Sequence, residues 1–325
     1  MMSMNEMGQN QARKGRSNLQ ALVMLFVLIG MFIVLSLLSP MFSRVGNVIN
    51  IFKQTAINGI LATGMACAIL VGGFDMSVGS TVGLSGIIAA LMATGGQEGL
   101  FLPVVCSVLA GLLVGVINGV AVAYMKVPAF VVTLGTQSIV RGLAYILSGG
   151  RPIFGVSESY EKIAGGLLFG KIPYLVIYYI VIALLMGFIL QCTVYGRRMY
   201  AVGGNAEAAR VSGINVEFIQ MSAFAICGLM GGIAGMLSTS RTVSAAPLTG
   251  EGYELDAIAS CVIGGFSMDG GAGKWYGMII GALILSVMSN GLDILGVASY
   301  YQRILKGAII IIIVLIDVRS KRKRT

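Results

Sequence analysis

Long apolar stretches separated by short polar segments fill the sequence from about residue 19 to residue 318. In hydrocarbon every backbone polar group must be satisfied within the protein, so apolar runs of about 20 residues predict membrane-spanning helices. The predicted spans cover residues 19–38, 48–71, 76–94, 102–124, 129–148, 173–191, 217–238, 254–268, 275–290 and 302–318. The pattern therefore predicts an all-α fold, a polytopic membrane bundle of about ten transmembrane helices.

Glycine interrupts some of these runs. The spans at 48–71, 76–94, 254–268 and 275–290 are short, glycine-rich or broken by polar residues, so we expect broken helices there. In addition, Val71-Gly72-Gly73-Phe74-Asp75-Met76 recurs later as Ile263-Gly264-Gly265-Phe266-Ser267-Met268. Duplicated halves with glycine breaks at matching places are typical of transporters, with the breaks near the conduction path. The alternative is chance, because the chain contains 46 glycines.

The positions of the positive charges predict which segments of the chain lie on the cytoplasmic side of the membrane. Lys and Arg gather before residue 19, in the loop 193–216 and after residue 318. Because cytoplasmic segments carry an excess of Lys and Arg, all three are predicted to be cytoplasmic, which requires an even number of spans. The predicted organisation is a cytoplasmic tail over 1–18, a transmembrane domain over 19–318 containing the cytoplasmic loop, and a basic cytoplasmic tail over 319–325.

Composition excludes several functions. With 57% hydrophobic and 11% charged residues and a mean hydropathy of +0.90, the chain is not a soluble domain. It has no histidine, and its five cysteines stand apart, so the usual general base and metal-ligand spacings are missing. The net charge of +9 resides in the tails and one loop, so no nucleic-acid partner is expected.

The loop 193–216 predicts a short helix of its own. Asn205 is a good N-cap, residues 206–211 are mostly helix formers, Glu207 suits the first turn, and Gly213 can end the helix in a left-handed conformation. A two-turn helix is not stable alone in water. It must therefore dock onto its own bundle or onto a second subunit, and the residues alone leave both possibilities open.

This loop resembles the coupling loop of the ABC-type monosaccharide permeases, the family of the ribose, galactose, arabinose and xylose importers. Two glycine-rich blocks, 72–80 and 252–273, are also similar to that family, and the resemblance extends from about Leu19 to Asp317. By this resemblance, the residues expected to couple the chain to an ATPase are Gly196, Arg197, Gly203, Gly204, Asn205, Glu207, Ala208, Ala209, Ser212 and Gly213.

The resemblance implies a multi-pass permease of the bacterial cytoplasmic (inner) membrane, embedded in lipid, with both termini cytoplasmic. Its implied partners are an ATP-binding-cassette ATPase subunit, a periplasmic or lipid-anchored sugar-binding protein and a second copy of the permease in a homodimer. The chain itself is not expected to be an enzyme. The pair Gly273-Lys274 lacks the first glycine of a phosphate-binding loop. By the resemblance, ATP-Mg belongs on the partner and no cofactor is expected here.

The sugar is not fixed by the sequence. Residues 290–302 look most like the ribose permease, which makes ribose the leading monosaccharide. The expected substrate path includes Gln54, Asn58 and Asp75, since sugars require polar groups within the spans. For Asp75, the alternative is a structural role as an N-cap near Met76 or as the partner of a cation.

Arg241, Glu251 and Glu254 are expected to meet the sugar-binding protein, although simple solvation of these charges explains them equally well. An ion-coupled secondary sugar transporter is the main alternative function, and it would require ionisable residues deep in the spans. A membrane enzyme is less favoured, because a paired acid and base in one cleft is not evident.

Overall fold

The structure, a computed structural model, describes residues 22–94 and 99–322. A helix over Leu22–Leu38 comes first. The helices that follow are α2 Val45–Leu70, α3 Val78–Ala93, α4 Phe101–Ala123, α5 Ala129–Ser148, α6 Glu158–Gly165, α7 Tyr174–Cys192, α8 Val194–Gly204, α9 Ala206–Val211, α10 Val216–Thr242, α11 Tyr253–Ile263, α12 Trp275–Ile294 and α13 Ser299–Arg322. The short strands are β1 Ile153–Phe154, β2 Leu167–Leu168, β3 Ile172–Pro173 and β4 Ser244–Ala245.

Every predicted span overlaps a helix, which confirms the all-α bundle. Among the described residues, five helices are long and apolar enough to cross a membrane by length and composition, namely α4, α5, α7, α10 and α12. Local signals explain where some of them begin and end. For example, α5 starts after Pro128 and ends at Gly149, which is left-handed.

The predicted span 254–268 needs correction. Only Tyr253–Ile263 is helical, and 11 residues at about 1.5 Å each extend over roughly 16 Å, about half of the hydrocarbon core. The preceding segment 246–252 consists of turns with Gly250 and Gly252 in left-handed conformations. The chain therefore enters this part of the bundle without a helix and becomes helical only within it, as expected for a broken span.

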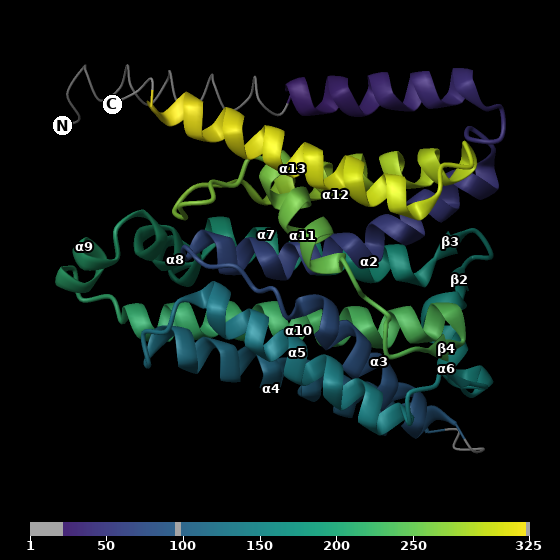
Figure 1. The fold of residues 1–325 in the computed structure, drawn as a ribbon, viewed down its shortest axis with the longest axis horizontal. Coiled ribbons are helices and arrows are strands. Elements are labelled where there is room, and N and C mark those ends of the chain that lie inside the picture. The colour runs from purple at the N-terminus through teal and green to yellow at the C-terminus, as the bar shows by residue number, and fades with distance from the viewer. Residues whose placement is uncertain (1–21, 95–98, 323–325) are drawn as a thin grey trace.

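The long helices run back and forth between two ends of the bundle (Figure 1). At one end, on the left of Figure 1, α8 and α9 protrude, α2 and α7 finish and α10 and α12 begin. The helix Leu22–Leu38 runs toward the opposite end, and α13 runs back toward the end that carries α8 and α9. At the other end lie the small β elements and α6.

Two antiparallel strand pairs cover that second end. Ile153 of β1 lies opposite Ala245 of β4, so the α5–α6 connection is joined to the chain that follows α10. Strands β2 and β3 pair within a short hairpin. The buried Tyr160 of α6 donates its hydroxyl to the Met236 carbonyl oxygen at 2.8 Å, which anchors α6 on α10.

The core is built around α10, which packs against α2, α3 and α4. Glycines allow the closest of these approaches. A Cβ atom at Gly111 or Gly115 of α4 would collide with the α10 backbone at Gly228, and one at Gly235 would collide with the Val82 carbonyl oxygen of α3. Small residues in membrane helices permit this close packing, which here is within one subunit. By contrast, α5 and α7 keep most of their apolar surface exposed.

Candidate functional site

Three side-chain caps shape the segment from Thr193 to Asn215, which protrudes at one end of the bundle. The Thr193 hydroxyl accepts from the Gly196 N–H at 3.1 Å and starts α8, and Asn205 Oδ1 accepts from the Ala208 N–H at 2.9 Å and starts α9. Asn215 Oδ1 starts α10 in the same way. The predicted N-cap at Asn205 and the predicted helix over Ala206–Val211 are therefore confirmed.

The left-handed end of α9 is also confirmed. Gly213 has a φ of 79°, its N–H donates to the Arg210 carbonyl, and the Ile214 N–H donates to the Ala209 carbonyl. These two bonds are the Schellman motif that satisfies carbonyls at a helix end. Ile214 and the adjoining α10 are thereby placed directly after the short helix.

Sequence reasoning missed α8, which adds an 11-residue helix before α9. Its glycines disfavour a helix on propensity alone, but two of them are required by close packing. A Cβ atom at Gly196 would collide with the Ile189 and Leu190 carbonyls of α7, and one at Gly203 would collide with the Leu70 carbonyl of α2. The signal available in the sequence was the polar Thr193, a good N-cap.

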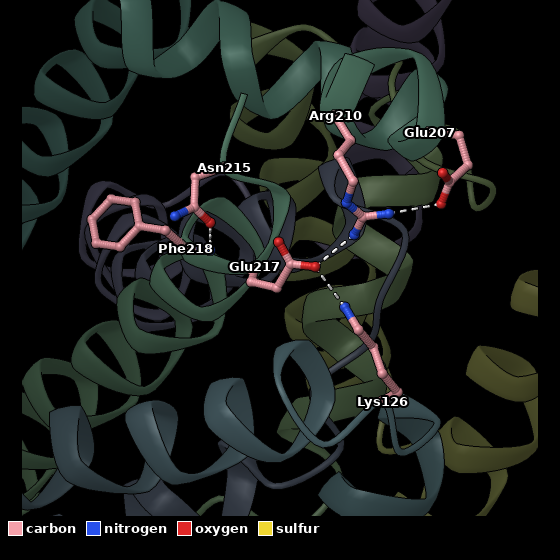
Figure 2. Close-up of polar contacts among 6 residues, drawn as sticks. All are labelled: Lys126, Glu207, Arg210, Asn215, Glu217 and Phe218. Carbon is pink, nitrogen blue, oxygen red and sulfur yellow. Dashed lines mark hydrogen bonds and ion pairs between the residues drawn. The ribbon is translucent and has the colours of Figure 1, made fainter. Parts of the chain in front are cut away.

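Ion pairs link α9 to the membrane helices (Figure 2). Arg210 contacts Glu207 one turn earlier and Glu217 at the start of α10, and Lys126 reaches the same Glu217 oxygen at 2.9 Å from the α4–α5 connection. The hydrogen bond and charge of Glu217, and then the charge of Glu207, raise the pKa of Arg210 above its ordinary value. Because Lys126 and Arg210 are both well exposed, each pair alone contributes little, but together they orient α9.

The predicted coupling residues divide into exposed and buried groups. The exposed ones are Arg197, Gly204, Asn205, Glu207, Ala208, Ser212 and Gly213. Val211 stands beside them with 89% of its surface exposed, the most protruding apolar side chain of α9. Ala209 and Gly196 are buried and Gly203 is half-buried. Ala209, only 4% exposed, faces the chain's own bundle, so only the opposite side of α9 is open to solvent.

Asp75 organises the beginning of α3. Its side chain is 1% exposed, and Oδ1 accepts from the Ser77 N–H at 2.9 Å and from the Ser77 hydroxyl at 2.6 Å. Asn118 of α4 donates to the same oxygen at 3.4 Å and to the Ser77 hydroxyl at 2.8 Å. Asp75 therefore has a structural role close to the predicted alternative, although the N-cap of α3 is Ser77 and Asp75 holds that residue in place. Its carboxylate is buried, and a role of Asp75 in the substrate path stays a prediction.

Gln54 and Asn58 lie one turn apart on α2, where Gln54 is half-buried and Asn58 is 7% exposed. The interactions described for residues 22–94 and 99–322 do not join either of them to Asp75. The described contacts therefore do not bring the three predicted path residues together. Path roles for Gln54 and Asn58 stay predictions.

The residues expected to meet a binding protein also separate. Arg241, at the end of α10, and Glu251 are exposed, and Glu251 pairs with Arg303 at 3.3 Å. Glu254 is instead 6% exposed, and its carboxylate lies against Gly79 of α3 and within 3.5 Å of the Gln137 amide nitrogen. Burial at the first turn of α11 removes Glu254 from any surface that a soluble protein could contact.

A pocket that sequence reasoning did not identify lies between α11 and α13, with several charged residues in its lining. It has a volume of about 300 Å³ and contains Tyr253, Asp256, Arg303 and Lys306. Lys306 contacts the buried Asp256 at 2.8 Å, and Arg303 contacts Glu251 at 3.3 Å, so two ion pairs contribute to the lining of this cavity. The signal in the sequence was a pair of cations within the first turns of the last apolar run.

These features define a multi-pass helical membrane protein with a helical protrusion at one end. Residues 47–314 match the family described as the branched-chain amino acid transport system, permease component. The chain belongs to this family of permeases. It is the membrane subunit of an ABC importer, a transport component rather than an enzyme, and its family implies an ATPase partner and a substrate-binding protein.

Similar proteins align over nearly the whole chain. The ribose import permease protein of Haemophilus influenzae is 40% identical over 97% of this chain and 98% of its own length, and that of Bacillus subtilis is 40% identical over 90% of each. The D-allose transport system permease protein of Escherichia coli is 37% identical over 90% of each. No solved structure matches the chain. Together with the apolar helices, the family places the chain in the bacterial inner membrane.

Proposed function

We propose that this permease imports a monosaccharide, with ribose as the leading substrate, and that the exposed side of α9 is the surface that receives the ATPase. The similarity to ribose and allose permeases supports the sugar. The main support for the proposed ATPase contact is the protrusion itself. It is a short helix, held by caps and ion pairs, with Val211 exposed on its outer side. Coupling requires a contact that differs between transport states, and α9 is suited to make one.

We place the α8–α9 end in the cytoplasm, and with it both termini. Arg197, Arg198 and Arg210 belong to this end, and α13 brings Arg319 back toward it. An excess of cations marks the cytoplasmic side of short membrane segments. On this orientation, Arg241 and Glu251 are available to a sugar-binding protein outside the cell, and a second copy of the chain completes a homodimer.

The decisive experiment is uptake of labelled ribose into vesicles that contain the permease, its ATPase and a ribose-binding protein. We expect uptake that requires ATP on the ATPase side. Val211→Glu would place a charge in the proposed contact and should abolish most ATP-driven uptake while leaving membrane insertion intact. Val45→Glu is the matched control, since Val45 is also a well exposed valine, 76% exposed, on a different helix. Normal uptake by Val211→Glu would exclude α9 as the ATPase contact.

The same vesicles test the alternative of an ion-coupled transporter. One observation favours it, the partly buried pair between Lys306 and Asp256, because ionisable residues inside a bundle are typical of ion-coupled carriers. Vesicles with the permease alone and an imposed proton or sodium gradient should take up no ribose. Gradient-driven uptake without the ATPase would replace the proposed function with this alternative.

A further inference from the structure

Three segments far apart in the sequence meet where α8 ends. They are the last turn of α2, the end of α8 and the loop between α11 and α12. The Gly271 N–H donates to the Leu70 carbonyl at 2.9 Å, which joins the first and third segments directly. Gly203 lies against both of them, and a Cβ atom there would overlap the Leu70 carbonyl oxygen and come within 2.5 Å of the Gly271 nitrogen.

The contact is between backbones, so it has little freedom to adjust. A Cβ atom at Gly271 would come within 2.5 Å of the Gly204 nitrogen, and one at Gly270 within 2.9 Å of the Gly72 nitrogen. Packed backbones without intervening side chains cannot yield by a change of rotamer. A displacement of α8 must therefore move these neighbours or break the contact.

A side chain strengthens the link to the second glycine turn. The Tyr200 hydroxyl of α8 donates to the Gly273 carbonyl at 2.9 Å. Met199 and Val202 on either side of Tyr200 are fully or almost fully buried, so this part of α8 is a packed element rather than a surface helix. By contrast, Tyr195 earlier in α8 bonds to Ser222 of α10, away from the glycine turns.

These contacts flank the two copies of the glycine motif, because Leu70 directly precedes the copy after α2, and Gly271 and Gly273 follow the copy after α11. We propose that Gly203 is a positioning residue through which movement of α8 and α9 is transmitted to both broken spans at once. This inference rests on the proposed function, because it assumes that an ATPase moves α9. It adds that both halves of the repeat respond to one contact, and it assigns that contact to backbone packing at Gly203.

Gly203→Ala tests the inference in the complete complex, reconstituted with the ATPase and a ribose-binding protein. The readout is the amount of labelled ribose imported per ATP hydrolysed, normalised to assembled complex, which a simple loss of folded protein does not change. We expect this ratio to fall by roughly fivefold or more, the lower bound of typical coupling between sites. Gly46→Ala is the control, because Gly46 is a helical glycine with open space around its Cβ position. Its ratio should stay within about twofold of the unmodified complex.

Tyr200→Phe supplies a milder variant, with Tyr195→Phe as its matched control, since each removes one hydroxyl from α8. If Tyr200→Phe imports less ribose per ATP hydrolysed than Tyr195→Phe does, the inference is supported. This comparison remains available if the Gly203→Ala protein does not accumulate. Equal ratios for each variant and its control would overturn the inference. If the unmodified complex does not couple ATP to ribose uptake, the proposed function itself fails, and the inference fails with it.

Discussion

The ends of α2 and α11 use the same hydrogen bonds. After α2, the N–H groups of Gly72 and Gly73 donate to the carbonyls of Ile69 and Ala68, both at 2.9 Å. Gly72, at a φ of 84°, is the left-handed residue of this Schellman motif. The turn satisfies carbonyls that would otherwise be unpaired inside the bundle.

After α11 the motif recurs one residue out of step. The N–H groups of Gly265 and Phe266 donate to Val262 and Cys261, both at 3.0 Å, and Gly265 is left-handed with a φ of 83°. In the sequence repeat, however, Gly72 aligns with Gly264. Each glycine pair therefore provides one left-handed residue, but it is the first glycine after α2 and the second after α11.

The remaining glycine of each pair serves a close approach. Gly73 faces the ring of Phe224, whose Cζ would be 2.7 Å from an added Cβ atom. Gly264 faces the backbone of Gly277 at the start of α12, with which a Cβ atom would collide. Gly-Gly in this repeat therefore meets two requirements, a left-handed turn residue and a close approach to a neighbour. Which of the two glycines meets which requirement depends on what packs against the turn.

The largest expected effect is the difference between Gly264→Ala and Gly73→Ala. Because backbone cannot move aside, Gly264→Ala should cost roughly 3 kcal/mol of unfolding free energy or more, at the top of the overpacking range. Gly73→Ala should cost about 1 kcal/mol, since the end of the Phe224 ring can turn away. Thermal unfolding of the detergent-purified variants, with Gly46→Ala as reference, measures this order. Equal losses would show that the two glycines have the same role.

The left-handed glycines form the second test. Gly72→Ala meets its nearest atom only at 3.8 Å, so its cost of about 1–2 kcal/mol comes from the backbone conformation and not from a collision. Gly265→Ala should cost a similar amount. Asn tolerates the left-handed region better than Ala, so Gly72→Asn should be the more stable of the two Gly72 variants in the same unfolding assay. A less stable Asn variant would mean that space, not φ, requires this glycine.

Much of this arrangement follows from local sequence. Apolar run lengths predicted where helices occur, because spanning helices must satisfy their own backbone. Asn205 and Gly213 predicted the ends of α9, since caps depend on a few neighbouring residues. The sequence also showed the repeat itself, and it predicted that helices are broken beside Gly72 and Gly264.

What the sequence could not predict depends on neighbours far along the chain. The one-residue shift between the two turns follows from Phe224 in one case and Gly277 in the other, and neither is part of the repeat. The burial of Ala209 follows from which side of α9 meets the bundle, a choice that a two-turn helix does not reveal. Asp256 and Lys306 become partners only once α13 packs against α11.

A third Schellman turn, at Gly213, allows the smallest test. It has the same two hydrogen bonds, but a Cβ atom at Gly213 would meet nothing within 4 Å, and the helix that it ends carries ion pairs in addition to the packed Ala209. Glu217→Gln weakens the contacts to both Lys126 and Arg210, yet exposed pairs contribute little, so we expect the smallest loss of unfolding free energy among these variants. The loss should shrink between about 0.05 M and about 1 M salt, because salt screens exposed charges.

The unfolding midpoints of Gly264→Ala and the unmodified protein should differ equally at both salt concentrations, since a backbone collision is not screened. A large, salt-independent loss for Glu217→Gln would place the α9 turn with the packed turns of α2 and α11 and remove the contrast between them.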